Sequence, residues 1–397
     1  FHRYSTDSNW LVPHFEKMLY DQAMMCMAYT EAYQATNKTE YKQTAEDILQ
    51  YVLTEMVDET GGFYSAEDAD SEGQEGKFYL WTRNEISKEL ADEAGLFCKI
   101  FNVSEEGNFT PLHDSVPGGN ILYLKKSLNE LASEMHMSPD HLEAFTKRTT
   151  RTLFEKRRKR VRPFKDTKIL TDWNGLMIAA VAKCAQAFNS EKYVEAAEKA
   201  LEFIFLRMTA QSGTLLHRYK DGEAAVEGMI DDYAFLIWGL IETYEASYIR
   251  DWLKKALELQ DIMIERLWDR QGTAFFFAPA TSARELPRIK EFNDGAIPSG
   301  NSVAFLNLAR LSRLTGRVDY EEKAAALGQT INAHSGQRNT MFLTAATFLV
   351  GPAHEIVVVG DPLSRSTLNM LKNVNAVYCP NKVVLFKSGN DDSLAEI

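Results

Sequence analysis

Pairs of helical segments recur along this chain, and they constrain its fold more than any other feature. Hydrophobic side chains repeat with the helical period over four pairs, at 14–36 with 39–56, 171–189 with 191–209, 231–248 with 250–267, and 300–315 with 318–334. The loop within each pair is short, so each pair is expected to form an antiparallel helical hairpin. Partial helices are expected at 83–92, 139–159 and 337–349.

A glycine turn followed by a short aromatic strand comes after each hairpin. The segments are "ETGGFYS" (59–65), "QSGTLLHRY" (211–219) and "RQGTAFFFAP" (270–279), and the opening "FHRYSTDS" (1–8) echoes "LHRYKDG" (216–222). Repeats of one supersecondary unit stack and share a core. The pattern predicts a mainly α fold: an (α/α)6-type toroid of helical hairpins with short strands in its loops. The N-termini of the inner helices are expected to face one end of a central cavity.

Two parts of the chain interrupt this repeat. Residues 61–125 contain two strand-like stretches around an acidic loop, and 354–386 read as strand, helix, strand and strand. We therefore expect the toroid over 1–350 and a small α/β segment over 351–397. Because residue 1 resembles the tail of a hairpin unit, the first hairpin is expected to lie upstream.

Composition limits the partners. The net charge is −12 and the pI is near 5.3, which argues against nucleic acid and anionic membranes. The basic run "KRRKRVR" (156–162) is interpreted as the end of a helix, where cations favour the helix dipole. No apolar run approaches the ~18 residues of a membrane span. The four cysteines form no CxxC and no zinc spacing, so we expect a cytoplasmic protein without cofactor or metal.

Acidic and amide side chains gather in the loops before the inner helices. These loops are "STDSNWLVPH" (5–14), "FKDTKILTDWN" (164–174), "EGMIDDY" (227–233) and "FNDGAIPSGN" (292–301). Asp, Asn, Ser and Thr are preferred N-caps, so capping alone explains any one of them. A helix needs one cap, however, whereas Asp231 and Asp232 are adjacent. Carboxylates accept hydrogen bonds from hydroxyls and tryptophan stacks on sugar rings, so this set also fits a sugar site.

The segment "VPHFEKMLYDQA" (12–23) is expected to open a helix at Pro13. In such a helix His14, Lys17, Met18 and Asp21 share one face, which we expect to line the cavity. The alternative is that His14 is a buried structural histidine. The strand before this helix carries Arg3 and Tyr4, and the later repeat carries His217 and Arg218 in the equivalent place.

The acidic loop "SAEDADSEGQEGKFY" (65–79) resembles the start of a calcium loop at Asp68, Asp70, Glu72 and Gly73. Tyr79 stands where an EF-hand needs glutamate, and the flanks are strands, so an EF-hand is not expected. A different calcium site, a loop over the cavity mouth and a solvated turn remain open.

Two sets of site residues follow. The candidates for catalysis are His14, Asp68, Asp70, Asp231 and Asp232. The candidates for substrate binding are Arg3, Tyr4, Trp10, Lys17, Asp21, Trp81, Asp166, Asp172, Trp173, Asn174, His217, Arg218, Asp294 and Asn301.

Several long blocks resemble one known family. They are "FHRYSTDSNWLVPHFEKMLYDQA", "AEDADSEGQEGKFYLWT", "KILTDWNGLMIAA", "DDYAFLIWGLIETYEA" and "DGAIPSGNSVA". They are similar to the thioredoxin-domain proteins related to the spermatogenesis-associated thioredoxin-like protein. The resemblance implies a thioredoxin-like domain followed by a toroid of the six-hairpin glycosidase type, similar to N-acylglucosamine 2-epimerases. The thioredoxin-like part is expected to be missing here and to be a partner of the toroid.

Three functions remain in competition. The first is a carbohydrate-active enzyme in which two of Asp68, Asp70, Asp231 and Asp232 act as acid and base on a sugar or glycan. The second is a sugar epimerase or isomerase that uses His14. The third is a non-catalytic module that binds a glycan or peptide for the thioredoxin-like domain. Carboxylates ~5–10 Å apart beside a tryptophan would favour hydrolysis, whereas carboxylates each paired with Arg or Lys would favour binding.

Overall fold

The computed structural model describes residues 1–109, 117–280, 288–334 and 339–389. The chain divides into two compact units. The first contains Phe1, Leu19–Ser65 and Thr167–Ile397, and the second contains His2–Met18 and Ala66–Asp166. No helix among the described residues is long and apolar enough to cross a membrane.

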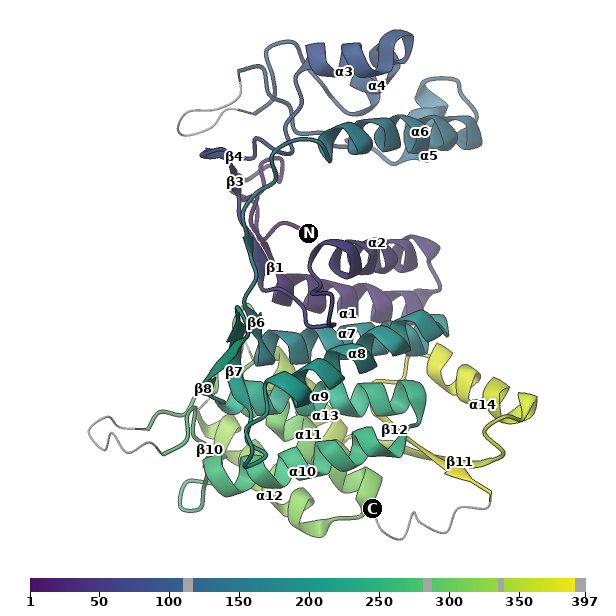
Figure 1. Ribbon diagram of the computed structural model, residues 1–397. Helices are drawn as coiled ribbons and strands as arrows, with labels where there is room; N and C mark the ends of the chain where they lie inside the picture. The colour runs from purple at the N-terminus through teal and green to yellow at the C-terminus, as the bar shows by residue number, and fades with distance from the viewer. Residues whose placement is uncertain (110–116, 281–287, 335–338, 390–397) are drawn as a thin grey trace. The chain divides into compact units, whose positions relative to one another are not determined.

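The first unit is built from a row of inner helices, each packed on the next (Figure 1). In order they are α1 (Leu19–Thr36), α7 (Thr171–Phe188), α9 (Ile230–Ser247), α11 (Gly300–Thr315) and α13 (Thr340–Val350). An outer helix packs on each of the first four: α2 (Thr39–Glu55), α8 (Glu191–Arg207), α10 (Arg250–Leu267) and α12 (Val318–His334). The four hairpins and the mainly helical toroid fold predicted from the sequence are therefore confirmed.

The hydrophobic pattern explains which helices are inner. Almost every side chain of α9 from Asp232 to Glu245 is buried, as expected of a helix that is apolar nearly all round. The outer helix α10 buries only a stripe, with Leu253, Ala256, Leu259 and Met263 along one face. The inner helices thus lie between the outer helices and the centre of the unit.

A short antiparallel pairing follows each of the first three hairpins, as the glycine-turn repeat predicts. Val57 pairs with Phe63, Thr209 pairs with Leu215, and β9 (Trp268–Asp269) pairs with β10 (Ala274–Phe275). The turns therefore fold the chain back on the end of the outer helix before it enters the next inner helix.

Buried carboxamides hold two of these bridges to the next inner helix. Asn174 of α7 accepts from the Phe63 N–H at 2.8 Å and donates to the Phe63 carbonyl at 3.0 Å. Asn301 of α11 makes the same pair of bonds with Phe275, at 3.0 and 3.1 Å. Both asparagines are fully buried, and these bonds give each of them a structural role. Their role in binding substrate stays a prediction.

Related contacts occur at α1 and α9. The Gln22 carboxamide of α1 bonds to the backbone nitrogen and carbonyl oxygen of Phe1, each at 2.7 Å. The fourth residue of α9 is Tyr233, and its hydroxyl accepts from the Leu215 N–H at 3.1 Å. The four helices α1, α7, α9 and α11 thus each fix a strand segment that precedes them in the chain.

A three-stranded antiparallel sheet leads into α7 and α9. Its order is β6 (Ile169–Leu170), β7 (Leu216–Lys220), β8 (Glu223–Glu227). Leu170 pairs with Arg218, so His217 comes beside the start of α7. This sheet is the element that positions His217.

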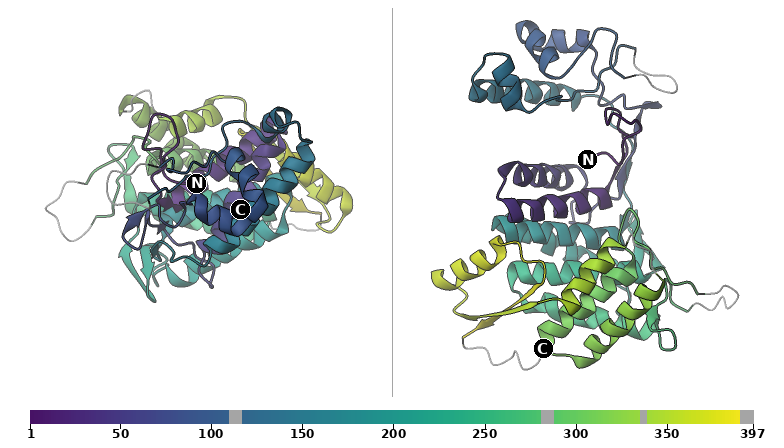
Figure 2. Two further views of the ribbon diagram at one scale, coloured as in Figure 1. Left: turned by 90° about the horizontal axis from the view of Figure 1, so that it is seen from above. Right: turned by 180° about the vertical axis from the view of Figure 1, so that it is seen from behind.

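The C-terminal segment of the first unit is a parallel βαβ piece, drawn in yellow beside the green helices (Figure 2). It consists of β11 (His354–Gly360), α14 (Arg365–Ala376) and β12 (Lys382–Ser388), with Val358, Leu371 and Val384 as its core. The prediction of two strands after the helix was wrong, because 377–380 is a loop that lines a cavity described below. The boundary at residue 350 stays a prediction, and 390–397 lie outside the described residues.

The second unit combines short strands with its own helical core. The strand order β1 (Lys17–Met18), β2 (Ala66–Glu67), β5 (Lys165–Asp166) forms one sheet, and β3 (Asp70–Ser71) with β4 (Gln74–Glu75) forms a hairpin. The helices are α3 (Arg83–Leu90), α4 (Ala94–Ile100), α5 (Leu128–Glu134) and α6 (Pro139–Arg157), with a 3-10 turn at Ala91–Glu93. Buried Trp81, Phe97, Leu142 and Phe145 belong to their core.

The predicted helix start at Pro13 was wrong. The His14 N–H donates to the Tyr4 carbonyl at 2.8 Å, and Lys17 pairs with Glu67 in β2, so this stretch forms cross-strand bonds instead. Helix α1 begins at Leu19. His14, Lys17 and Met18 therefore do not share a helix face with Asp21.

The basic run is only partly a helix end. Helix α6 ends at Arg157, and Arg160 lies beyond it with its guanidinium 4.1 Å from the Trp81 ring centroid. Arg160 also donates to the carbonyls of Phe78 and Leu80, at 2.9 and 2.6 Å. Part of this charge therefore holds a loop of the second unit in place.

Candidate active site

The first turns of α7 and α9 bring three carboxyl groups together. Asp172 is the second residue of α7, and Asp231 and Asp232 are the second and third of α9. Asp232 is fully buried and accepts from the backbone N–H groups of Asp172 and Met229, at 3.0 and 2.8 Å. It therefore caps its own helix and fixes the neighbouring helix start at once.

His217 completes this cluster. Its Nδ1 lies 2.9 Å from Oδ1 and 3.2 Å from Oδ2 of Asp232. The hydrogen bond to Asp232 raises the pKa of His217, because the carboxylate favours the charged imidazole. His217 thus contributes a proton donor held on a fixed carboxylate.

Asp172 is the most perturbed acid of the cluster. Burial, together with the charge of Asp232, raises the pKa of Asp172 to about 8. Its Oδ1 accepts the Trp173 N–H at 2.7 Å. Asp172 therefore holds a proton at neutral pH, as a general acid must.

Asp231 is half-buried and lies at the start of α11. Burial and the charge of Asp232 raise the pKa of Asp231 to about 7, although a hydrogen bond from the Gly300 N–H opposes the shift. A Cβ atom at residue 300 would lie 2.3 Å from Oδ1 of Asp231. Only glycine at 300 lets α11 approach this carboxyl group so closely.

The same cluster is where a metal ion could be held. Within the described ranges, Asp172, His217 and Asp232 each offer a ligand atom, and these atoms lie within 4.8 Å of one another. One imidazole nitrogen and two carboxylate oxygens suit a divalent transition metal. Asp232 already accepts two backbone N–H donors, however, which leaves it fewer free lone pairs for an ion.

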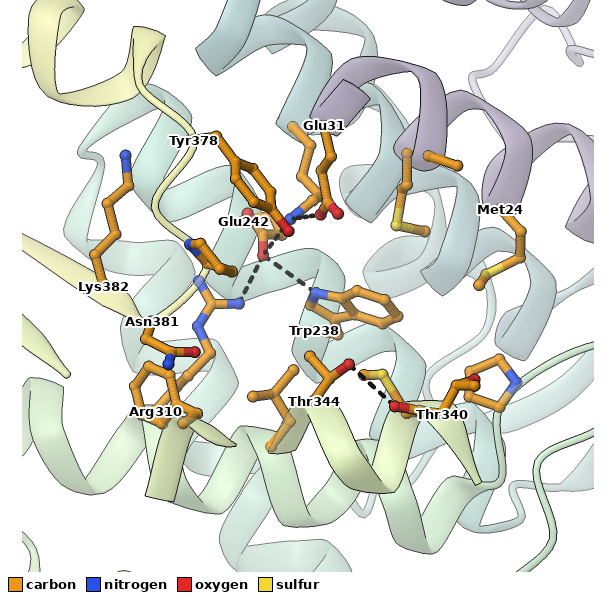
Figure 3. Close-up of a pocket in the computed structure, with 18 of the residues that line it drawn as sticks. Met24, Glu31, Trp238, Glu242, Arg310, Thr340, Thr344, Tyr378, Asn381 and Lys382 are labelled. Atoms are coloured by element: carbon orange, nitrogen blue, oxygen red, sulfur yellow. Dashed lines mark hydrogen bonds and ion pairs between the residues drawn. The ribbon is translucent and has the colours of Figure 1, made fainter. Parts of the chain in front are cut away.

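A cavity of about 350 Å³ lies among the inner helices of the first unit. It is lined by α1, α7, α9, α11 and α13 and by the loop 377–382. Figure 3 shows the Trp238 ring at its centre, with Glu31 and Tyr378 above it and Thr340 and Thr344 below in that view. The cavity therefore presents an aromatic ring surrounded by polar groups.

Ion pairs surround the cavity. Arg310 contacts Glu242 at 2.6 Å and Glu245 at 3.2 Å, and Lys183 contacts Glu31 at 2.9 Å. Burial would raise the pKa of Glu242, but Arg310 and Lys183 outweigh it and lower the pKa to about 2. The glutamates here are paired with Lys or Arg, whereas Asp172 and Asp231 have no such partner among the described residues.

Asp294 is the predicted residue that lines this cavity. Its carboxylate is already occupied, since it accepts from the backbone N–H groups of Met341 at 2.8 Å and Ser299 at 2.9 Å. It therefore caps α13 rather than facing a ligand with free oxygens.

The remaining predicted residues of the first unit are Asp21, Trp173 and Arg218. Trp173 packs edge-on against Tyr20, with ring centroids 4.9 Å apart. Asp21 is in the first turn of α1, and Arg218 follows His217 in β7. The structure thus brings Asp172, His217, Asp231 and Asp232 together.

The other predicted residues belong to the second unit and form contacts within it. Lys17 donates to Tyr79 at 2.8 Å and to Glu67 at 3.2 Å, and burial lowers its pKa to about 8. His14 Nδ1 lies 3.0 Å from Glu75. The residues of this group are Arg3, Tyr4, Trp10, His14, Lys17, Asp68, Asp70, Trp81 and Asp166.

Two of them contrast sharply in exposure. Trp10 is 86% exposed, whereas Trp81 is 2% exposed under Arg160.

In the acidic loop, burial and the neighbouring carboxylates of Asp68 and Glu75 raise the pKa of Asp70. Glu72 and Gly73 have positive φ and form the turn between β3 and β4.

Sequence reasoning missed the charged residues of the cavity. Lys183, Glu242, Glu245 and Arg310 each lie within an otherwise apolar inner helix. Trp238, Glu242 and Glu245 follow i, i+4, i+7 spacing, which puts them on one face. An ionisable residue inside a helix that is apolar all round was the available signal.

Comparison with known proteins confirms the family resemblance. The chain is 35% identical to spermatogenesis-associated protein 20 of Rattus norvegicus and of Homo sapiens, over 99% of this chain and 54% of each relative. It is 33% identical to an uncharacterized protein of Caenorhabditis elegans, over 98% of this chain and 58% of that protein. The chain spans about half the length of these relatives. No family model matches it.

Solved structures confirm the fold. A sugar epimerase from a ruminal bacterium matches with a TM-score of 0.51 and 11% identity, over 84% of this chain and 64% of that chain. The GH76 α-mannanase of Bacteroides thetaiotaomicron matches with a TM-score of 0.50 and 11% identity, over 91% and 73%. At such low identity the likeness shows the α/α toroid fold alone.

Proposed function

We propose that the first unit binds a saccharide and processes it by carboxylate acid–base chemistry, in the manner of a glycoside hydrolase. The observation that carries this proposal is the cluster at the starts of α7 and α9. Asp172 and Asp231 have pKa values raised to about 8 and about 7, and neither has a Lys or Arg partner among the described residues. Acids tuned to neutral pH are what acid–base catalysis requires.

The roles follow from the environments. Asp172, protonated at neutral pH, is the general acid that donates to the leaving oxygen. Asp231, which titrates near pH 7 and is half-buried, is the base that activates water. Asp232 and His217 are positioning residues, since Asp232 holds the α7 backbone at Asp172 and fixes the imidazole.

The proposal departs from two expectations. The acid–base pair comes from Asp172 and Asp231 rather than from Asp68 and Asp70, which belong to the second unit. The epimerase scheme that uses His14 loses its basis, because His14 is on no inner helix and is paired with Glu75.

A non-catalytic glycan-binding module is the second candidate. The ion pairs of the cavity favour it, since Glu31, Glu242 and Glu245 are each engaged by Lys183 or Arg310. In that case the unit would present its ligand to the thioredoxin-like domain that the family resemblance implies.

Hydrolysis of aryl glycosides tests the two candidates. The 397-residue chain is assayed with neutral α- and β-linked glycosides, including α-mannosides because one structural neighbour is an α-mannanase. The Asp231→Asn variant is expected to lose about 100-fold or more in kcat/KM. The matched Asp221→Asn variant, at an exposed turn with φ 51°, keeps wild-type rates. Absence of turnover with every glycoside, despite binding, would favour the binding module.

A further inference from the structure

Trp238 is built into the central cavity as a fixed aromatic surface. Its indole N–H donates to Oε1 of Glu242 at 3.1 Å, and the ring lines the cavity together with Met24 and Thr344 (Figure 3). Trp238 lies six residues after Asp232 on α9, which is about 9 Å along the helix axis. The ring therefore lies on the helix that carries two of the clustered acids.

The carboxylate that holds the ring is itself held from several sides. Glu242 pairs with Arg310 at 2.6 Å and accepts from Nε2 of Gln186 at 3.1 Å. Lys183 lies 4.0 Å away. Since four side chains meet at one buried carboxylate, the indole has a single orientation and needs little reorganisation to receive a ligand.

One donor in the cavity wall is unpaired but buried. Arg310 is 6% exposed, and its two terminal nitrogens form ion pairs with Glu242 and Glu245. Its Nε is buried and has no hydrogen-bond partner among the described residues. Because this nitrogen has almost no accessible surface and the terminal nitrogens are engaged by the two glutamates, Arg310 offers a ligand in the cavity no free N–H donor.

The charges of the cavity decide what kind of ligand fits. Its basic residues are Lys183, Arg310 and Lys382, and its acidic residues on the inner helices are Glu31, Glu242 and Glu245. Asp294 adds a carboxylate that already accepts the Met341 N–H at the start of α13. A ligand carboxylate would compete with the ion pairs of Lys183 and Arg310, and Lys382 already donates to the Val374 carbonyl. The four acidic residues of the lining also outnumber its three bases, which disfavours a further negative charge. A neutral ligand leaves the pairs intact.

We propose that this cavity binds a neutral saccharide, with one sugar ring stacked on Trp238. The apolar face of a sugar ring fits an indole, and a volume of about 350 Å³ is within the range of small-molecule pockets. The inference deepens the proposed function and rests on it for the assignment of the ligand to sugars.

Fluorine NMR tests the proposal on the folded wild-type chain. The six tryptophans are replaced with 5-fluorotryptophan, and the Trp238 and Trp252 signals are assigned from Trp238→Phe and Trp252→Phe variants. Trp252 is the matched control, because it is similarly buried and its indole donates to Glu198 at 3.0 Å on an outer helix. Mannose, glucose, N-acetylglucosamine and glucuronate are then titrated. We expect a neutral sugar to shift the Trp238 signal and leave the Trp252 signal in place.

The variants give the second measurement. Trp238→Leu is expected to weaken binding of the neutral sugar at least tenfold in a calorimetric titration, and Trp252→Leu is expected to leave it unchanged. A preference for glucuronate, or a sugar that binds without moving the Trp238 signal, would overturn the inference. Binding that needs Trp238 but is accompanied by no turnover would support the inference and refute the proposed hydrolysis. Turnover without any response at Trp238 would refute the inference and support the proposed hydrolysis.

Discussion

Nδ1 of His217 lies 2.9 Å from Oδ1 of Asp232, the carboxylate that also accepts the backbone N–H of Asp172. One buried group thus connects a strand of the β6–β7–β8 sheet with the starts of two inner helices. The protonation of Asp172 is coupled to that of His217, because the charge of the imidazole partly opposes the rise in the pKa of Asp172.

Replacing His217 with glutamine removes that charge. The pKa of Asp172 should then rise further above its value of about 8. If Asp172 is the general acid, the alkaline limb of the kcat/KM profile moves to higher pH, since the acid keeps its proton longer. The profile is compared with that of His141→Gln, at an exposed position in the other unit. An unmoved alkaline limb in the His217 variant would exclude Asp172 as the titrating acid.

Replacing Asp172 with asparagine tests the same group through stability. The folded pKa of Asp172 is raised from 3.8 to about 8, so the folded state binds the extra proton between these values. The stabilisation from this proton is complete below about pH 4 and is lost as the pH rises through 8. One proton gives a slope of at most about 1.4 kcal/mol per pH unit. Denaturant unfolding at several pH values should show a smaller loss of stability with rising pH in Asp172→Asn. Parallel pH curves for the two proteins would contradict the shift.

Gly300→Ala should disturb the site without replacing an ionisable residue. The new methyl group would lie 2.3 Å from Oδ1 of Asp231, so either that carboxyl group or α11 must move. We expect a loss of about 1–3 kcal/mol of stability and a drop in kcat/KM. Gly95→Ala is the control, because its Cβ would meet nothing within 4 Å in helix α4. Wild-type activity in Gly300→Ala would show that the position of Asp231 is unimportant.

Asn174→Ala and Asn301→Ala should destabilise the fold to a similar degree. Each side chain bonds to both backbone groups of one buried residue and to one further carbonyl. Leaving such groups unpaired costs about 1–3 kcal/mol each, so we expect a loss of about 2–4 kcal/mol per variant. Urea titration is the measurement, with the exposed Asn84→Ala as control. If either variant lost sugar binding at unchanged stability, the structural role would be refuted for that residue.

Arg310→Met should be more damaging than removal of the whole ion pair. The substitution leaves Glu242 and Glu245 buried without their main partner, for which about 3–5 kcal/mol is expected. Arg310→Met with Glu242→Gln and Glu245→Gln should recover part of this loss. Equal stability of the single and triple variants would argue that the charges are not coupled.

The sequence predicted the helical body well, because burial forces a strong period on it. The bounds of α7, α9, α10, α11 and α12 differ from those predicted by one residue or none. The failure at Pro13 has a local cause. Residues 13–18 begin with proline and are compatible with a helix. They form strand contacts instead, because His14 bonds to the Tyr4 carbonyl and Lys17 pairs with Glu67, which lie outside the segment. Local propensity does not carry that information.

The candidate site shows the same limit. The excess of acids at Asp231 and Asp232 over what one cap needs pointed to the start of α9, and His217 came from the repeat of "HRY". A buried amide that bonds to backbone and an amide that binds a ligand look alike in sequence, so the backbone bonds of Asn174 and Asn301 could not be predicted. Glu242 and Arg310 of the cavity were not predicted because they lie inside helices, whereas the predicted residues come mostly from loops.

The contacts that Gln22, Asn174, Tyr233 and Asn301 make with the preceding strand segments have a consequence for how such a protein arises. Asn174, Tyr233 and Asn301 each join their own hairpin to the one before it. A chain segment that forms one such hairpin therefore contains its own attachment to its neighbour, so that hairpins can be added to the row or removed from it as units.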